Sequence, residues 1–126
     1  ITCYAGFLVA QQAIIRMLKL GKGSIFFTGA SASKKGFANS SVFAMGKFGL
    51  RGLAQSLARE LHPKNIHICH FIIDGIISKK DISENLNNEH NKLDPDEIAK
   101  NYLNIYLQEK NCWTWEIELR PWLEKF

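Results

Sequence analysis

The sequence has few cysteines and no long apolar run, and acidic residues are scarce in its first two thirds. Its three cysteines, Cys3, Cys69 and Cys112, cannot all pair within one chain. Their spacing is also too wide for a zinc or redox motif. Because disulfide bonds are rare in the cytoplasm, we expect free thiols in a cytoplasmic protein.

The longest apolar stretch near the start, AGFLVA at residues 5–10, is interrupted by Gln11 and Gln12. It falls well short of the roughly 18 apolar residues that a membrane span requires. The chain begins without Met or a basic segment, which argues against a signal peptide. We therefore expect no membrane partner, and we interpret Ile1 as the edge of a fragment.

Acidic residues are few up to Lys80, where 11 Lys/Arg stand against 2 Asp/Glu, whereas 5 stand against 10 from Asp81 onward. The net charge is +4. A basic body with an acidic final third can neutralise itself in the fold or hold an anionic ligand. Nucleic acid is not favoured as a partner, because the lysines are scattered and no aromatic residues alternate with them.

The composition, with 46% hydrophobic and 22% charged residues, is typical of one compact soluble domain and excludes disorder and coiled coil. Hydrophobic periodicity, glycines and prolines then divide the chain. The expected helices cover about 6–20, from 41 or 42 to 61, and 95–107. The expected strands cover 24–28, 66–73 and part of 113–119, and the expected loops cover 29–39 and a polar lid at 78–93.

Helices and strands alternate in this order, and the helices are long enough to connect parallel strands. The sequence therefore predicts an α/β fold with a parallel sheet. Two or three strands make a poor parallel sheet, since strands that are apolar on both faces need neighbours at both edges. We expect a single incomplete domain over residues 1–126 that lacks a part upstream, and residues 111–126 form its final strand and tail.

Two short patterns resemble parts of ligand-binding motifs, but each has an explanation that requires no ligand. Gly21 and Gly23 precede a strand, whereas a phosphate-binding glycine loop follows a strand and opens a helix. His67 and Cys69 share one face of a predicted strand, while His70 points to the other. Because this pair has no third ligand nearby, we predict no metal site.

Three glycines, Gly46, Gly49 and Gly52, recur at three-residue intervals inside the second long helix. Each lowers helix stability by about 0.5–1 kcal/mol relative to alanine. They therefore indicate close packing, either within the chain or between subunits. We expect self-association through the helices at 6–20 and 42–61.

Phe43 and Lys47 lie one turn apart at the start of that helix and share a face. The surrounding segment, GSIFFTGASASKKGFANSSVFAMGKFGLRGLAQSLARELHPKNIHICHFIIDGII, resembles the second half of a short-chain dehydrogenase/reductase. In that family a strand ends in serines, a Tyr-x-x-x-Lys motif opens the next helix, and the following strand ends in Pro-Gly. The resemblance implies part of a doubly wound, Rossmann-like sheet whose nucleotide-binding half is missing.

The departures from the family pattern fall on its chemistry. Lys47 matches the lysine that holds the nicotinamide ribose, but Phe43 stands where the tyrosine acid is expected and has no proton to donate. Ala30 takes the serine position, so Ser31 is the remaining hydroxyl at that site. Thr2 takes the asparagine position, and Asp74 replaces the proline of Pro-Gly.

The resemblance implies that the coenzyme, NAD or NADP, would contact mainly backbone at two strand ends. The implied cofactor-binding residues are Thr28, Gly29, Ala30, Lys47, Asp74, Gly75, Ile76 and Ile77, and a family threonine falls near Ser78. The first hypothesis is an NAD(P)(H)-dependent oxidoreductase acting on a carbonyl or alcohol substrate, with Lys47 and an atypical acid such as Ser31 or water. The alternative is a catalytically silent reductase-like binding or dimerisation module. The 126-residue chain alone is expected to be inactive and to bind neither coenzyme, because the pyrophosphate loop is absent.

Overall fold

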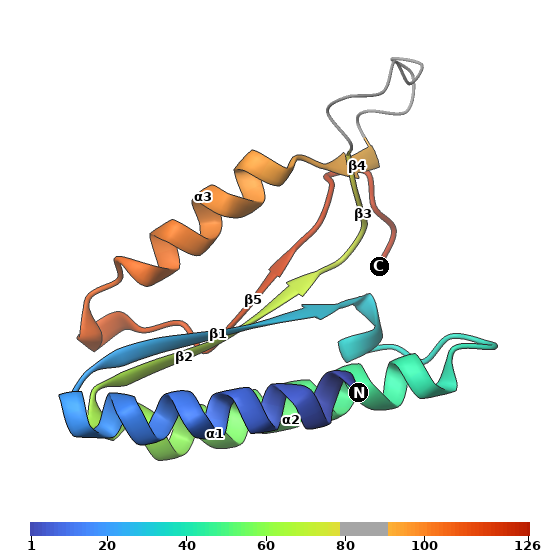
Figure 1. The fold of residues 1–126 in the computed structure, drawn as a ribbon. Coiled ribbons are helices and arrows are strands. Elements are labelled where there is room, and N and C mark those ends of the chain that lie inside the picture. The colour runs from blue at the N-terminus through green and yellow to red at the C-terminus, as the bar shows by residue number, and fades with distance from the viewer. Residues whose placement is uncertain (79–90) are drawn as a thin grey trace.

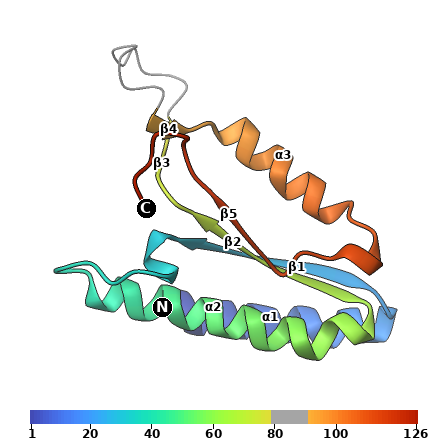
Figure 2. The ribbon, with the colours of Figure 1, turned by 180° about the vertical axis from the view of Figure 1, so that it is seen from behind.

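The computed structural model describes residues 1–78 and 91–126. A three-stranded parallel sheet has α1 (Thr2–Leu20) and α2 (Ser41–Leu61) on one face and α3 (Pro95–Tyr106) on the other (Figures 1 and 2). The sheet contains β1 (Gly23–Ala30), β2 (Ile66–Ile73) and β5 (Glu116–Leu119), in the order β1-β2-β5. This arrangement confirms the predicted α/β fold with parallel strands.

The helix ends follow local chemistry. After α1, Gly21 adopts the left-handed conformation with φ 70° and donates its N–H to Leu18 O, as a C-terminal glycine does. At α3, the Asp94 side chain accepts a hydrogen bond from the N–H of Asp96, and Pro95 takes the first helical position. Both boundaries agree with the sequence-based prediction to within one residue.

Pairing between strands decides boundaries that local sequence does not show. β1 runs in register with β2 from Gly23 opposite Ile66 to Ala30 opposite Ile73, so it extends beyond the predicted 24–28. α1 begins at Thr2 rather than near residue 6. Such ends depend on hydrogen bonds to distant segments and on helix packing.

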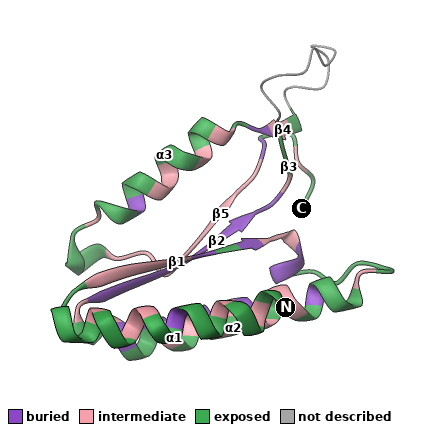
Figure 3. Cartoon of the chain, in the orientation of Figure 1, coloured by how far each residue is buried: buried purple, intermediate pink, exposed green. Residues whose placement is uncertain are grey.

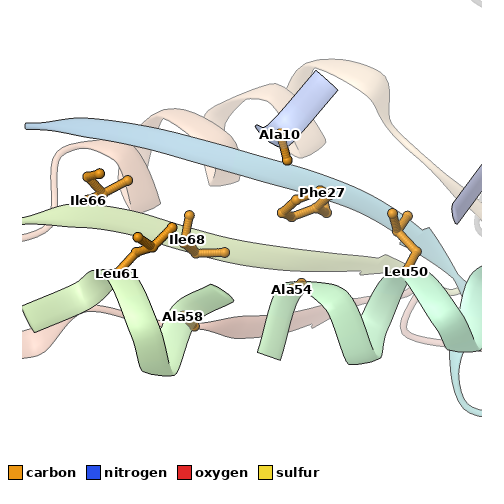
Figure 4. Packing of buried hydrophobic residues seen from close by; sticks show 8 residues of the cluster. All are labelled: Ala10, Phe27, Leu50, Ala54, Ala58, Leu61, Ile66 and Ile68. Atoms are coloured by element: carbon orange, nitrogen blue, oxygen red, sulfur yellow. The ribbon is translucent and has the colours of Figure 1, made fainter. Parts of the chain in front are cut away.

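The buried core is centred on β2, the middle strand of the sheet. All eight residues of β2 are buried, as expected for a strand covered on both faces (Figure 3). Ile66 and Ile68 pack with Phe27 of β1 against residues from α1 and α2, including Ala10 and Ala54 (Figure 4). The opposite face of the sheet packs against α3 through Cys69, Phe71, Ile73 and Ile105.

The C-terminal strand is shorter than the alternating pattern indicated. β5 covers only Glu116–Leu119, and it pairs with the final half of β2. Trp113 lies outside it and stacks on His67, with ring centroids 4.6 Å apart. The tryptophan therefore covers the sheet from a loop.

A second, two-stranded sheet was not predicted. β3 (Ile76–Ile77) pairs in parallel with β4 (Lys92–Leu93), and Ser78 N donates to Leu93 O at 2.8 Å. These short strands hold together the two ends of the segment predicted as a lid, 78–93. Residues 79–90 of that segment lie outside the described residues.

The glycines of α2 have different surroundings. A Cβ at Gly49 would approach Cys3 Sγ of α1 to 2.9 Å, whereas one at Gly52 would meet nothing within 4 Å. Gly49 therefore permits close packing of α2 on α1 within the chain. Among the described residues, no helix has the length and apolar character needed to cross a membrane.

Candidate functional site

The sequence-predicted site residues come together at the carboxyl ends of β1 and β2. Because Ala30 and Ile73 are register partners, the residues that follow them, Ser31 and Asp74, leave the sheet side by side. α2 then returns along the sheet face and presents Lys47 to the end of β1. Open α/β sheets bind ligands at this edge.

Lys47 is fixed by the backbone of β1. Its ammonium donates to Thr28 O at 2.9 Å and lies 5.8 Å from the centroid of the Phe43 ring. Partial burial lowers the pKa of Lys47 from its ordinary value. The shared face of Phe43 and Lys47 is thus confirmed, and 52% of Phe43 is exposed beside the ammonium.

Ser31 and Asp74 belong to a chain of polar contacts. The Ser31 hydroxyl donates to the Asp74 carboxylate, and Arg120 Nε donates to Asp74 Oδ2 at 3.2 Å. Burial alone would raise the pKa of Asp74, but these two hydrogen bonds and the charge of Arg120 keep it below its ordinary value. Asp74 is therefore an anion at neutral pH, and the proton of Ser31 is directed towards it.

Gly29 is a point of close approach. A Cβ there would lie 2.4 Å from His70 Nε2 and 2.6 Å from Ser33 Oγ. Ser33 is fully buried, and its hydroxyl accepts a hydrogen bond of 3.1 Å from Ala30 N. The side chains of His70 and Ser33 therefore pack directly against the Thr28–Ala30 segment.

The second predicted strand end has a different character. Gly75 has φ 153°, and a Cβ at this position would approach Pro121 Cδ to 2.9 Å, so the turn favours glycine. Ile76 and Ile77 are 69% and 47% exposed. The structure thus leaves an apolar surface next to Asp74 where the resemblance places cofactor contacts.

Sequence reasoning missed a charged cluster under the sheet. Arg51 donates from Nε and Nη2 to the two carboxylate oxygens of Glu116, at 2.6 and 2.8 Å. The same Glu116 accepts from His70 Nδ1 at 3.0 Å. One available signal was the period of β5, which turns Glu116 towards the face occupied by α2, and another was the helical spacing of Arg51 from Lys47.

The pair His67 and Cys69 is accounted for by packing. His67 Nε2 lies 2.9 Å from Thr114 O, and burial raises the pKa of the Cys69 thiol to about 12. A thiol with so high a pKa is a poor ligand and a poor nucleophile. Within residues 1–78 and 91–126, no group of three or more His, Cys, Asp or Glu is placed to hold a metal ion.

These features define a class of protein: an α/β chain with a Rossmann-type parallel sheet and a lysine-bearing helix at its carboxyl edge. The profile of the short chain dehydrogenase family matches residues 1–91. The chain therefore belongs to the short-chain dehydrogenase family.

Individual relatives agree with this assignment. Sepiapterin reductase of Chlorobaculum tepidum is 28% identical over 115 residues, which cover 91% of this chain and 47% of that protein. The 3-oxoacyl-[acyl-carrier-protein] reductase of Bos taurus is 33% identical over 82 residues, which cover 65% of this chain and 34% of that protein. The chain thus matches less than half the length of either relative.

Solved structures show the same relation. A short-chain dehydrogenase from Rhodopseudomonas palustris is 43% identical with a TM-score of 0.78, and the match covers 96% of this chain and 49% of that one. A metagenomic short-chain oxidoreductase in complex with NADP shares the fold at 22% identity, with a TM-score of 0.72 and coverage of 96% and 48%.

Proposed function

We propose that this chain forms the lysine-bearing half of an NAD(P)(H)-dependent oxidoreductase that acts on a carbonyl or alcohol group of a small molecule. The observation that carries the proposal is the placement of Lys47 against Thr28 at the carboxyl end of β1, in a member of this family. The names of both curated relatives describe reductases, which supports carbonyl reduction as the reaction class.

The residues at the site fit a nicotinamide coenzyme. Lys47 offers an ammonium that can bind hydroxyl groups of a ribose, and Thr28 contributes backbone beside it. At the end of β2, Ile76 and Ile77 contribute exposed apolar surface. The coenzyme, when bound, supplies or accepts a hydride. The chain itself orients the ring through these strand ends, and Asp74 keeps its negative charge at that edge.

The proton must come from a group other than residue 43. Phe43 has no ionisable hydrogen, so Ser31 or a water held by Lys47 takes the role of acid in this proposal. Ser31 already donates to Asp74, so its own supply of a proton requires that this contact changes when substrate binds.

A hybrid protein tests the proposal. The amino-terminal half of the Rhodopseudomonas palustris enzyme is joined ahead of Ile1, because the match covers 49% of that enzyme and the family resemblance places this chain in the second half. We expect the hybrid to bind NADH or NADPH, and we expect Lys47→Ala to abolish binding and any turnover of a carbonyl panel. Lys64→Ala, at an exposed lysine paired with Glu60, is the control.

Phe43→Tyr in the hybrid tests the chemistry directly. It places a phenol one turn before Lys47, whose charge lowers the phenol pKa and makes it an effective acid. Because general acid catalysis contributes typically 10²- to 10⁴-fold, we expect a rate increase of that order. Unchanged rates in both Phe43→Tyr and Lys47→Ala would contradict the enzyme proposal.

One observation favours a second candidate, a binding module that retained the fold without turnover. The tyrosine position holds an exposed phenyl ring in Phe43. In that case the hybrid binds coenzyme but converts no carbonyl, and Phe43→Tyr alone does not create activity.

We also propose a homo-oligomer that uses the outer faces of α1 and α2. Apolar side chains are exposed there, including Val9 at 71%, Val42 at 77% and Met45 at 70%. Exposed apolar side chains of this kind support a contact with another protein surface if they form one patch in the assembled protein.

A further inference from the structure

The contacts around Lys47 form a closed cycle of residues from three strands, β1, β2 and β5, and one helix, α2. Lys47 holds Thr28 O, and the next residue, Gly29, lies over His70 Nε2. His70 bonds Glu116, Glu116 bonds Arg51, and Arg51 returns to Lys47 one turn earlier on α2.

We propose that Glu116, together with Arg51 and His70, is a positioning device for Lys47. The carboxylate holds α2 to β5 through Arg51 and holds His70 beneath the end of β1. These two contacts fix the helix and the strand between which the lysine ammonium lies. The proposal concerns the geometry of the chain itself. It rests on the proposed oxidoreductase function only for the reason why Lys47 needs a fixed position.

The geometry of Glu116 supports this role. Its side chain is only 15% exposed, it receives two guanidinium bonds in a fork arrangement, and it faces His70 as a register partner across β2 and β5. Arg–carboxylate pairs of this kind add geometric specificity as well as energy. A paired carboxylate is thus held in one place between helix and sheet.

His70 has a defined tautomer as a consequence. A carboxylate can only accept, so the ring carries its hydrogen on Nδ1, and Nε2 keeps a lone pair. The ring is fully buried, and Nε2 has no hydrogen-bond partner in the described structure. Burial lowers the pKa of His70, and the positive charges of Arg51 and Lys47 act in the same direction against the opposing effect of Glu116.

Leaving Nε2 of His70 buried without a partner costs free energy. We infer that the other contacts of the imidazole ring offset this cost and hold it in place. On one side it bonds Glu116, and on the other its edge fills the space that a side chain at residue 29 would occupy. A glycine at 29 and a histidine at 70 are therefore matched. The position of β5 thus determines where the imidazole ring of His70 lies, and the imidazole ring in turn supports the end of β1 that binds Lys47.

The experiment uses the 126-residue chain and nuclear magnetic resonance of its lysine side chains. We expect the Lys47 ammonium to give a resolved proton–nitrogen signal, because its hydrogen bond to Thr28 slows exchange with water. Glu116→Gln keeps the size of the side chain but removes its charge, and we expect this signal to be lost. Glu60→Gln, which removes a carboxylate paired with Lys64 at the far end of α2, is expected to leave it unchanged.

A persistent, unshifted Lys47 signal in folded Glu116→Gln overturns the proposal. Glu116→Asp keeps the charge and is expected to retain part of the signal, whereas a residue that merely fills space would tolerate Gln better than Asp.

A second measurement needs no variant. We expect the ring nitrogens of His70 in the unaltered chain to report a neutral ring with hydrogen on Nδ1 at pH 7. Hydrogen on Nε2 with none on Nδ1 would overturn the inferred contact with Glu116 even if Glu116→Gln fails to fold, because Nδ1 could then not donate to the carboxylate. Neither measurement involves coenzyme or turnover, so an inactive hybrid leaves this result standing and affects only the proposed function.

Discussion

At the scale of single residues, the site depends on close approaches between buried polar groups. Gly29 lies against His70 and Ser33, and Thr28 receives Lys47 through its carbonyl. The charged residues nearby are paired: Asp74 bonds Arg120, and Glu116 bonds Arg51. Partners of this kind offset the cost of removing charges from water.

Replacement of Gly29 by alanine tests this close packing. A Cβ would lie 2.4 Å from His70 Nε2, and the ring is held by Glu116, so it cannot move away easily. Overpacking of this kind costs about 1–3 kcal/mol, and we expect the free energy of unfolding to fall by that amount in urea titration.

Gly52→Ala is the matched control for that substitution. Nothing lies within 4 Å of a Cβ at Gly52, and the residue is inside α2. We expect a gain of about 0.5–1 kcal/mol from the higher helix propensity of alanine. Equal effects at Gly29 and Gly52 would show that the space under Gly29 adapts.

At the scale of elements, helix ends set where side chains are presented. α3 begins where the Asp94 carboxylate accepts a hydrogen bond of 2.7 Å from Asp96 N, followed by Pro95. α3 covers the sheet face that holds Phe71, on which Tyr102 stacks with ring centroids 3.6 Å apart. The stability of this helix start therefore affects the cover of one sheet face.

Asp94→Ala removes the acceptor at the start of α3. Loss of an N-cap of this type costs about 1 kcal/mol, so we expect the midpoint of thermal unfolding to decrease. Asp94→Asn retains an oxygen acceptor and is expected to stay near the unaltered chain. Circular dichroism during heating measures both, and equal losses in the two variants would argue against a capping role.

At the scale of the whole molecule, the described sheet has an exposed edge. β1 pairs with β2 on one side, and within residues 1–78 and 91–126 no strand pairs with its other side. An edge strand with free backbone groups favours pairing with further strands. The chain spans about half the length of each of the two related structures described above.

Self-association is the prediction that belongs to this scale. We expect the chain to sediment above monomer mass at micromolar concentration, and Met45→Glu on α2 to lower that mass by placing a charge in an apolar contact. Leu107→Glu, at a residue 65% exposed just after α3, is the control outside the proposed surface. A monomeric unaltered chain, or equal behaviour of the two variants, would count against the α1 and α2 surface.

The sequence by itself determined the order of the three helices and of the three strands of the main sheet, and the shared face of Phe43 and Lys47, but not the short strands β3 and β4. These features follow from periods of two and 3.6 residues and from glycine and proline signals, all of which act over a few positions. The prediction of a strand at 66–73 is confirmed residue for residue, because β2 is a continuous apolar run between turn signals. The family pattern pointed to Lys47 for the same reason: its motif is local.

Only the tertiary structure decided which distant residues share the site. Arg51 and Glu116 are 65 positions apart, and His70 and Glu116 are 46 apart. Local spacing can indicate the face on which each residue lies, but not that these residues touch. The pairing of β2 with β5 brings these residues together, and the return of α2 over the sheet then adds the arginine. Strand register and helix packing are cooperative properties of the whole fold. For that reason only the tertiary structure shows the cluster of polar and charged residues around Lys47.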